Sequence, residues 1–300
     1  QFNDWVNQRD ESFSEFIQIG SKKDKLSTTL FNSYSQGLLT ARDAWCYNAS
    51  REVVNSNMKR MSDFYNKEVK RYQQVSGGNT STDNFVTLDP GKIGWTGNLK
   101  RDLEREKLSL FDRKNTRQSI YRPFTKRWVY FDRKFNERVY QLPKIIPTTQ
   151  TKNKCVCVSG IGSRSGFSAF ITAELPNYDN LEKGQCFPLY LYEKTKDDTI
   201  PLDGTSDLFV EKLKDPSRHG YTRKDGISDA GLEHFKTAYP NDAVKKEDIF
   251  YYVYGLLHSP EYRERYADNL SKELPRIPCV KTAKDFWHFS QAGRDLAELH

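Results

Sequence analysis

The sequence predicts a mixed α+β fold, with a β-rich centre flanked by an N-terminal helical spacer and a C-terminal helical segment. Helical spacing of apolar residues is confined to the two ends of the chain, whereas short apolar runs separated by Gly, Pro and Asn fill the middle. Aromatic residues make up 13% of the 300 residues, which is too many for a disordered chain even with 29% charged residues. We expect aromatic side chains to fill much of the core. The predicted divisions are residues 1–75, 76–200 and 201–300.

The first division, residues 1–75, is predicted to be helical. Its long helix is expected within the stretch "ARDAWCYNASREVVNSNMKRMSDFYNKEVKRYQQV", with Asn48 or Ser50 as the cap at its start. The stretch "SGGNTST" from Ser76 ends it, because glycine and small polar residues favour turns. Spacings of three and four residues place one apolar stripe on the helix, formed by Val53, Val54, Met58, Met61, Phe64, Tyr65, Val69 and Tyr72.

The second division, residues 76–200, is predicted to be mainly β-structure. Four apolar or aromatic runs are expected to be strands: "RWVYF", "CVCVSG", "FSAFIT" and "FPLYLY". The charged stretch "TGNLKRDLEREKLSLF" interrupts the pattern and predicts a short helix. A linker is expected at "KTKDDTIPLDGTSD", which begins at Lys194.

The last division, residues 201–300, is predicted to be helical. The stretch "KKEDIFYYVYGLLH" has a strongly apolar face. Ser259 followed by Pro260 is a typical helix start, since serine caps the amide end and proline suits the first turn. "PRIP" at Pro275 to Pro278 ends that helix.

The positive charge is concentrated in one part of the chain, residues 100–138, which we call the basic segment. It holds 13 of the 47 Lys and Arg but only 6 of the 40 Asp and Glu, so the remaining residues are neutral overall. Concentrated positive charge indicates a polyanionic partner, although a solvated basic surface gives the same composition.

Metal, nucleotide and membrane sites have no support in the sequence. The five cysteines are odd in number and irregularly spaced, which favours reduced thiols in a cytoplasmic protein over zinc or a disulfide framework. Neither a phosphate-binding P-loop nor an H-E-x-x-H pattern is present, and no apolar run is long enough to cross a bilayer. No cofactor is therefore expected for this chain. It opens on Gln rather than Met, which suggests a piece of a longer protein.

The stretch "SGIGSRSG", Ser159 to Gly166, superficially resembles a dinucleotide-binding loop. The run that follows it predicts a strand, whereas a dinucleotide-binding loop leads into a helix. The alternatives are a plain hairpin turn and a loop that contacts nucleic acid. In the second case, backbone amides and the Ser163 hydroxyl would approach a phosphate, and Arg164 would reach a base edge.

The stretch "SIYRPFTKRWVYFDRKFNERVYQLP", Ser119 to Pro143, mixes seven aromatic residues with closely spaced Lys and Arg. We expect Tyr121, Phe124, Tyr130 and Phe131 to pack in the core. Exposed positions are expected for Arg127, Arg133, Lys134 and Arg138. Arginine presents a planar fork that matches phosphate oxygens or the O6/N7 edge of guanine, so this stretch is suited to a groove of DNA.

Four stretches, in this order, resemble a known family. "NDWVNQRDESF" near the start, "YRPFTKRWVYFDRKFNER" at Tyr121, "CVCVSGIGSRSGFSAFITAELPNYD" with "GQCFPLYLY", and "DIFYYVYGLLHSPEYRERYADNLSKELPRIP" are similar to the C-terminal part of type ISP restriction–modification enzymes. Their Tyr-Arg-Pro-Phe element also resembles that of other single-chain enzymes that combine restriction with adenine methylation.

The resemblance implies that the chain is a target recognition domain for double-stranded DNA. Its parent would be one polypeptide with a nuclease, an ATP-driven translocase, an N6-adenine methyltransferase and this domain, and would use S-adenosylmethionine, ATP and Mg. The methyltransferase domain would be its partner within that polypeptide. The catalytic motifs of the parent are absent from this sequence, so the chain itself is not expected to be an enzyme.

The expected contact residues follow from charge and position. Phosphate or base contacts are predicted for Arg117, Arg122, Lys126, Arg127, Arg133, Lys134, Arg138, Ser163 and Arg164, with Lys100 and Arg101 as peripheral phosphate contacts. The alternative function is a protein-interaction scaffold, which docks neighbouring domains and contacts no specific DNA sequence.

Overall fold

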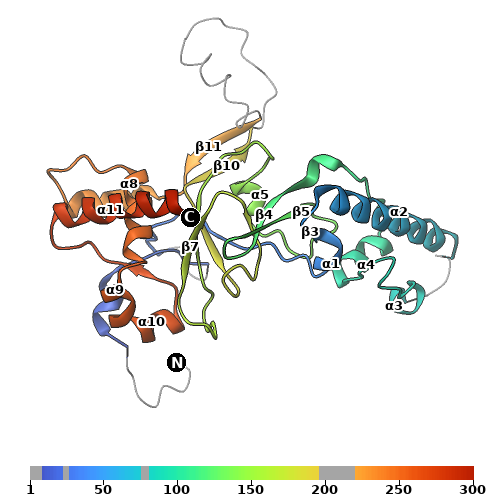
Figure 1. The fold of residues 1–300 in the computed structure, drawn as a ribbon, viewed down its shortest axis with the longest axis horizontal. Coiled ribbons are helices and arrows are strands. Elements are labelled where there is room, and N and C mark those ends of the chain that lie inside the picture. Colours follow the sequence, from blue (N-terminus) through green and yellow to red (C-terminus); the bar gives the residue numbers. More distant parts are fainter. Residues whose placement is uncertain (1–8, 23–26, 76–80, 196–219) are drawn as a thin grey trace, which may run out of the picture. The chain divides into compact units, whose positions relative to one another are not determined.

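The computed structural model describes residues 9–22, 27–75, 81–195 and 220–300 (Figure 1). The chain divides into two compact units. Unit 1 contains Gln1–Gln36, Gln141–Ala173 and Tyr178–His300, and unit 2 contains Gly37–Tyr140 and Glu174–Asn177. The predicted linker after Lys194 lies almost entirely outside the described residues, as do residues 1–8 of the predicted spacer and residues 76–80 of the glycine-rich turn.

Unit 2 consists of a long helix, several short helices and a small sheet. Its elements are α1 (Asp43–Cys46), β3 (Tyr47–Asn48), α2 (Arg51–Val75), α3 (Thr82–Phe85), α4 (Gly97–Glu104), a 3-10 turn at Arg113–Asn115, β4 (Thr116–Arg122), β5 (Thr125–Tyr130) and β8 (Leu175–Pro176). The sheet order is β3-β5-β4-β8, with β8 parallel to β4 and the other pairs antiparallel.

Helix α2 is the predicted long helix, and it begins and ends where the sequence indicates. The Ser50 hydroxyl accepts a hydrogen bond from the Val53 amide at 3.4 Å, so Ser50 rather than Asn48 caps the helix. Its buried apolar face is formed by Val54, Met58, Met61, Tyr65 and Val69. Val53, which was predicted on that face, is 42% exposed.

Helical structure does not extend through the earlier part of residues 1–75. Before α2, the described residues of this region form short strands and single turns of helix. One cause is local: the Asn48 side chain accepts a hydrogen bond from the Ser50 amide at 3.0 Å, which makes a turn that competes with helix. The expectation of a helical first division is therefore correct for α2 and wrong for most described residues that precede it.

Unit 1 contains the second four-stranded sheet, two strand pairs and the described C-terminal helices. Its elements are a 3-10 turn at Glu11–Glu15, β1 (Ile17–Gln18), β2 (Ser35–Gln36), α5 (Leu142–Ile145), β6 (Cys155–Val158), β7 (Ala169–Thr172), β9 (Gln185–Pro188), β10 (Tyr190–Lys194), β11 (Tyr221–Asp225), α7 (Asp229–Ala238), α8 (Lys246–Leu256), α9 (Pro260–Arg265), α10 (Ala267–Lys272), β12 (Arg276–Ile277) and α11 (Ala283–Leu299). The larger sheet has the antiparallel order β2-β9-β6-β7, and the pairs are β10 with β11 and β1 with β12.

The predicted strand "FPLYLY" is two strands in different sheets. Strand β9 ends at Pro188, which has no amide hydrogen to continue the ladder. Strand β10 begins at Tyr190, whose amide and carbonyl both bond the Asn153 side chain, at 3.1 and 2.8 Å. The single-strand prediction is wrong because a side chain replaces the neighbouring strand at this point.

The helices of unit 1 close an aromatic core, as the composition predicts. Rings of Phe235, Tyr252 and Phe286 lie within 4.9 to 5.7 Å of one another, and all three are buried. Helices α8 and α11 lie side by side (Figure 1) and cross at Gly255 and Gly293. A Cβ atom at Gly293 would lie 1.9 Å from the Tyr251 carbonyl oxygen, so only glycine allows this crossing.

The mixed α+β prediction is thus confirmed, including the helix start at Ser259, whose hydroxyl caps α9. No helix in the described part of the chain is long and apolar enough to cross a bilayer. As a functional division, the three predicted regions remain a prediction.

Candidate nucleic-acid interface

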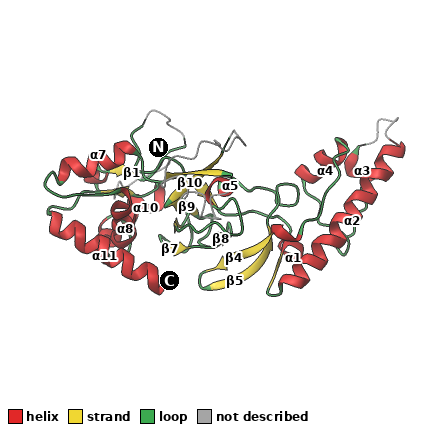
Figure 2. Ribbon diagram, turned by 90° about the horizontal axis from the view of Figure 1, so that it is seen from above, coloured by secondary structure: helices red, strands yellow, loops and turns green. Residues whose placement is uncertain are grey.

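Strands β4 and β5 form a hairpin (Figure 2). It carries the first half of the aromatic and basic stretch from Ser119 to Pro143. Arg122 pairs with Thr125, so Pro123 and Phe124 make the turn. Phe124 has a φ of 58°, a left-handed conformation that favours glycine, and it is 72% exposed. The prediction that Phe124 packs in the core is wrong, because the turn places it beyond the sheet. Tyr130 and Phe131 are buried as predicted.

Tyr121 fixes two arginines on this hairpin. It is the extra residue at a bulge between Ile120 and Arg122, and its ring is only partly buried. The guanidinium carbons of Arg122 and Arg127 lie 4.3 and 4.7 Å from the centre of its ring. Its hydroxyl donates to the Asp43 carboxylate at 3.1 Å, and burial followed by the charge of Asp43 raises the pKa of Tyr121. The ring therefore holds two positive charges without neutralising them.

Three predicted contact residues are exposed arginines. Arg127, on β5, and Arg133 and Arg138, in the loop after it, are exposed. Within the described ranges none of the three forms an ion pair. Their exposure was predicted correctly.

Lys134 was also predicted to be exposed, and that prediction is wrong. Its ammonium donates to the Lys107 carbonyl at 2.9 Å and lies 3.5 Å from the Asp102 carboxylate, and its side chain is only 17% exposed. Lys134 therefore fastens the loop after β5 to the end of the α4 region. Arg117 is similarly part of the fold, since its guanidinium is half-buried over the Phe131 ring at 4.8 Å.

The other predicted residues of the basic segment have nearby partners. Lys126 lies 3.3 Å from the Glu174 carboxylate and Lys100 lies 2.5 Å from that of Asp83. Arg101 is exposed and donates to the Asn98 side chain and the Gly97 carbonyl of its own helix. One side chain of each pair is well exposed, and ion pairs open to solvent are worth little, so the carboxylate competes weakly with another anion for the lysine. Arg122 also donates to the Asn177 side chain at 3.1 Å.

In unit 1, strands β6 and β7 are joined by residues 159–168, which we call the Arg164 loop. It is a hairpin connection, as predicted, and the side chain of Arg164 is 95% exposed. The donors predicted to approach a phosphate are bonded instead to one carboxylate of the same unit, Glu182. The Ser163 hydroxyl donates to it at 2.8 Å, the amides of Arg164 and Ser165 at 2.9 and 3.3 Å, and the Ser165 hydroxyl at 3.2 Å.

Glu182 fixes both the backbone and the side chain of Arg164. Besides the bonds to the loop amides, its second oxygen lies 3.4 Å from Arg164 Nε. The hydrogen bonds, that from Ser163 first, lower the pKa of Glu182 to about 2. The bond uses Nε, and the terminal guanidinium nitrogens of Arg164 form no hydrogen bond with Glu182. The loop is thus an anion-binding nest that already contains an anion.

The nest depends on a close approach between two backbone segments. Glu182 and Lys183 both have positive φ, 43° and 59°, which is strained for residues with a Cβ atom. The Gly160 amide donates to the Glu182 carbonyl at 3.0 Å, and a Cβ at Gly160 would lie 2.7 Å from the Lys183 carbonyl oxygen. Glycine at position 160 is therefore required for this contact, for a reason unrelated to a cofactor.

The roles of two residues at the candidate interface, Phe124 and Glu182, were not identified from the sequence. The Pro-Phe pair between two predicted strands is a turn signal that could have placed Phe124 outside the core. Glu182 gave no local signal, because its partners lie about twenty residues away along the chain. No group of three or more His, Cys, Asp or Glu side chains suited to a metal occurs among the described residues.

Comparison with known proteins identifies the protein family whose model matches this chain. The family model described as the Type ISP C-terminal specificity domain matches residues 29–300. No match was found among curated proteins.

Three solved structures resemble the chain over 99% of its length. They are a nuclease-deletion mutant of the Type ISP restriction–modification enzyme LlaGI in complex with a DNA substrate mimic (30% identity, TM-score 0.78), the ATP-dependent Type ISP enzyme LlaBIII bound to DNA (30%, 0.79), and a DrdV–DNA complex (29%, 0.79). The chain spans 24%, 17% and 27% of those three chains, respectively.

Proposed function

Because this chain belongs to the Type ISP C-terminal specificity domain family, we propose that it binds double-stranded DNA at a specific sequence, as a target recognition domain. The observation that carries the proposal is the β4–β5 hairpin with its following loop. There, exposed arginines are held by ring stacking or left without a carboxylate partner in the described parts of the chain. LlaGI, LlaBIII and DrdV were each solved with DNA, which supports the same function here.

The proposed contacts divide into two kinds. Arg127, Arg133, Arg138 and Arg164 are the candidates to read base edges, because they are exposed arginines and can present a bidentate fork. Residues proposed to contact phosphates are Lys100, Arg101, Arg122 and Lys126. In this proposal Ser163 orients the Arg164 loop, and Arg117 and Lys134 support the fold beside the contacts.

Phe124 adds an apolar contact to the proposed interface. A strained, exposed aromatic side chain at the tip of a basic hairpin is suited to apolar contact with a base or with sugar edges. We include it in the proposed interface.

The longer protein in this proposal is a restriction–modification enzyme. The specificity domain would orient an N6-adenine methyltransferase of the same polypeptide so that one adenine is turned out of the duplex into its active site. Binding would also license ATP-dependent translocation and cleavage. S-adenosylmethionine, ATP and Mg would serve those other domains, and we assign no chemical step to the 300 residues described here.

The functional division of the chain follows the same proposal. Residues 1–75 would form the spacer after the methyltransferase, residues 76–200 the recognition core and residues 201–300 a C-terminal subdomain. The compact units cross these boundaries, since unit 2 combines α2 of the spacer with the basic hairpin. Both units therefore supply proposed contacts, unit 2 through the hairpin and unit 1 through Arg164.

Selection from a pool of random duplexes tests the proposal. Sequences recovered on the chain should share a consensus, and a duplex carrying it should bind at least about a thousandfold more tightly than a scrambled duplex. Binding of both duplexes should weaken as salt rises, because phosphate contacts release counterions.

A protein-interaction scaffold gives a different result in the same experiment. It would show no consensus and no preference between the two duplexes at either of two salt concentrations. That outcome would overturn the proposed function.

A further inference from the structure

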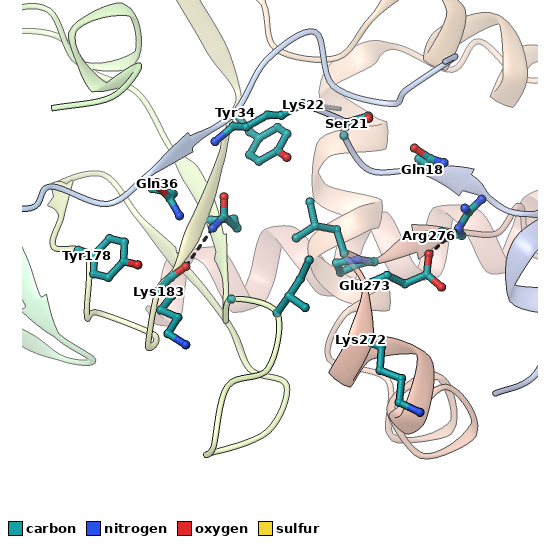
Figure 3. Close-up of a pocket in the computed structure, with 16 residues that line it drawn as sticks. Gln18, Ser21, Lys22, Tyr34, Gln36, Tyr178, Lys183, Lys272, Glu273 and Arg276 are labelled. Carbon is teal, nitrogen blue, oxygen red and sulfur yellow. Dashed lines mark hydrogen bonds and ion pairs between the residues drawn. The ribbon is translucent and has the colours of Figure 1, made fainter. Parts of the chain in front are cut away.

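Unit 1 contains a cavity of about 560 Å³ that the proposed contacts do not use (Figure 3). Its walls come from the segment after β1, from β2, from the start of the Arg164 loop, from the segment before β9, and from the residues that follow α10. Because all these walls belong to unit 1, the cavity is a property of that unit alone.

The cavity lining carries an excess of positive charge. Lys22, Lys183, Lys272 and Arg276 contribute four cations, and among the described residues that line the cavity Glu273 is the only one with a carboxylate. Glu273 lies 3.2 Å from Arg276, so these two charges compensate each other. Of the lysines that line the cavity, Lys22 lies on one side and Lys183 and Lys272 lie on the other (Figure 3). An anion is the ligand that this charge favours.

Lys22 indicates the same ligand by its surroundings. Its ammonium lies 4.3 Å from the centre of the Tyr34 ring, and partial loss of water lowers the pKa of Lys22. In the described ranges no carboxylate pairs with it. A cation that has lost part of its water and lacks a carboxylate is stabilised when an anion binds.

Three side-chain amides contribute to the lining of the cavity. They belong to Gln18, Gln36 and Gln185, and Tyr178 also lines the cavity. The Gln185 amide nitrogen donates to the Lys183 carbonyl at 3.0 Å, which orients this side chain and leaves its oxygen available as an acceptor. An amide offers a donor and an acceptor side by side, which matches the edge of a nucleobase.

The size of the cavity decides between an inorganic anion and a larger ligand. A single phosphate would fill only a small part of 560 Å³, whereas cavities of roughly 300–1,000 Å³ hold small organic ligands. We propose that this cavity is a nucleotide-binding site, which takes a base among the glutamine side chains and a phosphate at Lys22.

An extrahelical nucleotide of bound DNA is one source of this ligand, and for that source the inference rests on the proposed function. Gly160 and Ile161 line the cavity and belong to the Arg164 loop, so a strand contacted by Arg164 passes close to the opening. The Gly162 amide donates to the Ser271 carbonyl at 3.1 Å and fastens the loop to the end of α10. A free nucleotide is the other source of the same chemistry.

Titration calorimetry of the whole chain with adenosine and cytidine monophosphates, inorganic phosphate and the two nucleosides tests the site. A nucleoside monophosphate should bind at least tenfold more tightly than phosphate or the nucleoside alone. Equal binding of monophosphate and inorganic phosphate, or absence of binding by every probe including the DNA described below, would overturn the proposal.

Two substitutions separate the phosphate and base contacts. Lys22→Gln should weaken monophosphate binding about tenfold and leave nucleoside binding unchanged, because it removes one charged contact. Gln36→Leu should weaken binding of the monophosphate and of the nucleoside together. Lys236→Gln, outside the cavity on α7, is the matched control and should change neither. Unchanged binding in both cavity variants would contradict the assignment.

DNA distinguishes the two sources and separates this inference from the proposed function. A duplex with one extrahelical nucleotide should bind more tightly than the fully paired duplex, and Lys22→Gln should remove that gain. If the gain is absent while free monophosphates bind, the ligand is a free nucleotide and the site stands. Sequence preference for paired duplexes with no gain and no monophosphate binding would overturn only the site, whereas loss of all duplex preference would overturn the proposed function.

Discussion

The β4–β5 hairpin and the Arg164 loop both present arginine at a connection between antiparallel strands, but they fix it by different forces. On the hairpin, the Tyr121 ring holds the guanidinium groups of Arg122 and Arg127 by stacking. In the Arg164 loop, the Glu182 carboxylate holds the backbone and Nε of Arg164.

The difference lies in the charge that remains. Ring stacking restricts an arginine and leaves its positive charge intact, so the hairpin can attract phosphate over a distance. A carboxylate restricts the arginine and cancels much of its charge, so the loop gains geometry more than attraction. We therefore expect the hairpin to dominate affinity and the loop to act mainly through shape and fit.

The largest effect on stability is expected from Gly160→Ala, which disturbs the Arg164 loop and leaves the β4–β5 hairpin unchanged. The new Cβ would meet the Lys183 backbone at 2.7 Å and force Glu182 away from its nest. We expect a loss of about 3 kcal/mol in the free energy of unfolding, measured by denaturant titration. Gly97→Ala, at a position with open space around it, should change stability by less than about 1 kcal/mol. Equal stability of the two variants would show that the close approach is not maintained.

Arg127→Ala tests the hairpin side of the comparison. Loss of an arginine that reads a base should weaken binding to the selected duplex by about 2 kcal/mol and relax the choice at one base pair. Arg127→Lys should recover only part of the loss, because lysine has no planar fork. Fluorescence anisotropy with single-base variants of the site measures both effects. An unchanged base preference would remove Arg127 from the base-reading residues.

Lys126→Ala should give a smaller and different change. The Lys126 side chain is 60% exposed and lies 3.3 Å from the partly buried Glu174 carboxylate, and its proposed partner is a phosphate. Binding should weaken alike for selected and scrambled duplexes, and the slope of log K against log salt should fall by about one. A loss confined to the selected duplex would instead place Lys126 at a base.

The smallest effect on stability is expected from Glu182→Gln, and this effect should depend on pH. The pKa of Glu182 is lowered from 4.5 to about 2 in the folded chain, so its stabilising contribution is complete above pH 4.5 and is lost as the pH falls towards 2. The variant should be less stable than the original chain near pH 7, and the difference should shrink with acidification. Thermal unfolding across this pH range measures it; a difference independent of pH would show that the charge of Glu182 does not hold the loop.

Much of the fold follows from patterns within a few residues. Helix α2 follows from its apolar stripe and Ser50, and the start of α9 follows from Ser259 and Pro260, because caps and helical spacing are local properties. The break between β9 and β10 was missed, since it depends on the side chain of Asn153, more than thirty residues away.

The sequence predicted which part of the chain carries the basic residues of the candidate site, but it did not predict how several of their side chains are held. Charge counting identified the hairpin, and arginines with no local partner were correctly expected to be exposed. Lys134 and Glu182 could not be placed, because each is fixed by a contact that only the folded chain brings together. Phe124 was misassigned because an aromatic residue usually packs, and here the turn overrides that preference.

The position of β8 in the unit 2 sheet has a consequence for how the protein is made. The chain leaves unit 2 after Tyr140 and returns only at Glu174–Asn177, where β8 pairs with β4 in parallel. Translation proceeds from the N-terminus, so this sheet can be completed only after residue 177 emerges from the ribosome. Unit 1 can be completed only later in translation, because Ile17 on β1 pairs with Ile277 on β12. We expect unit 2 to mature before unit 1 on the nascent chain, while β1, the first described strand of these 300 residues, is among the last to find its partner.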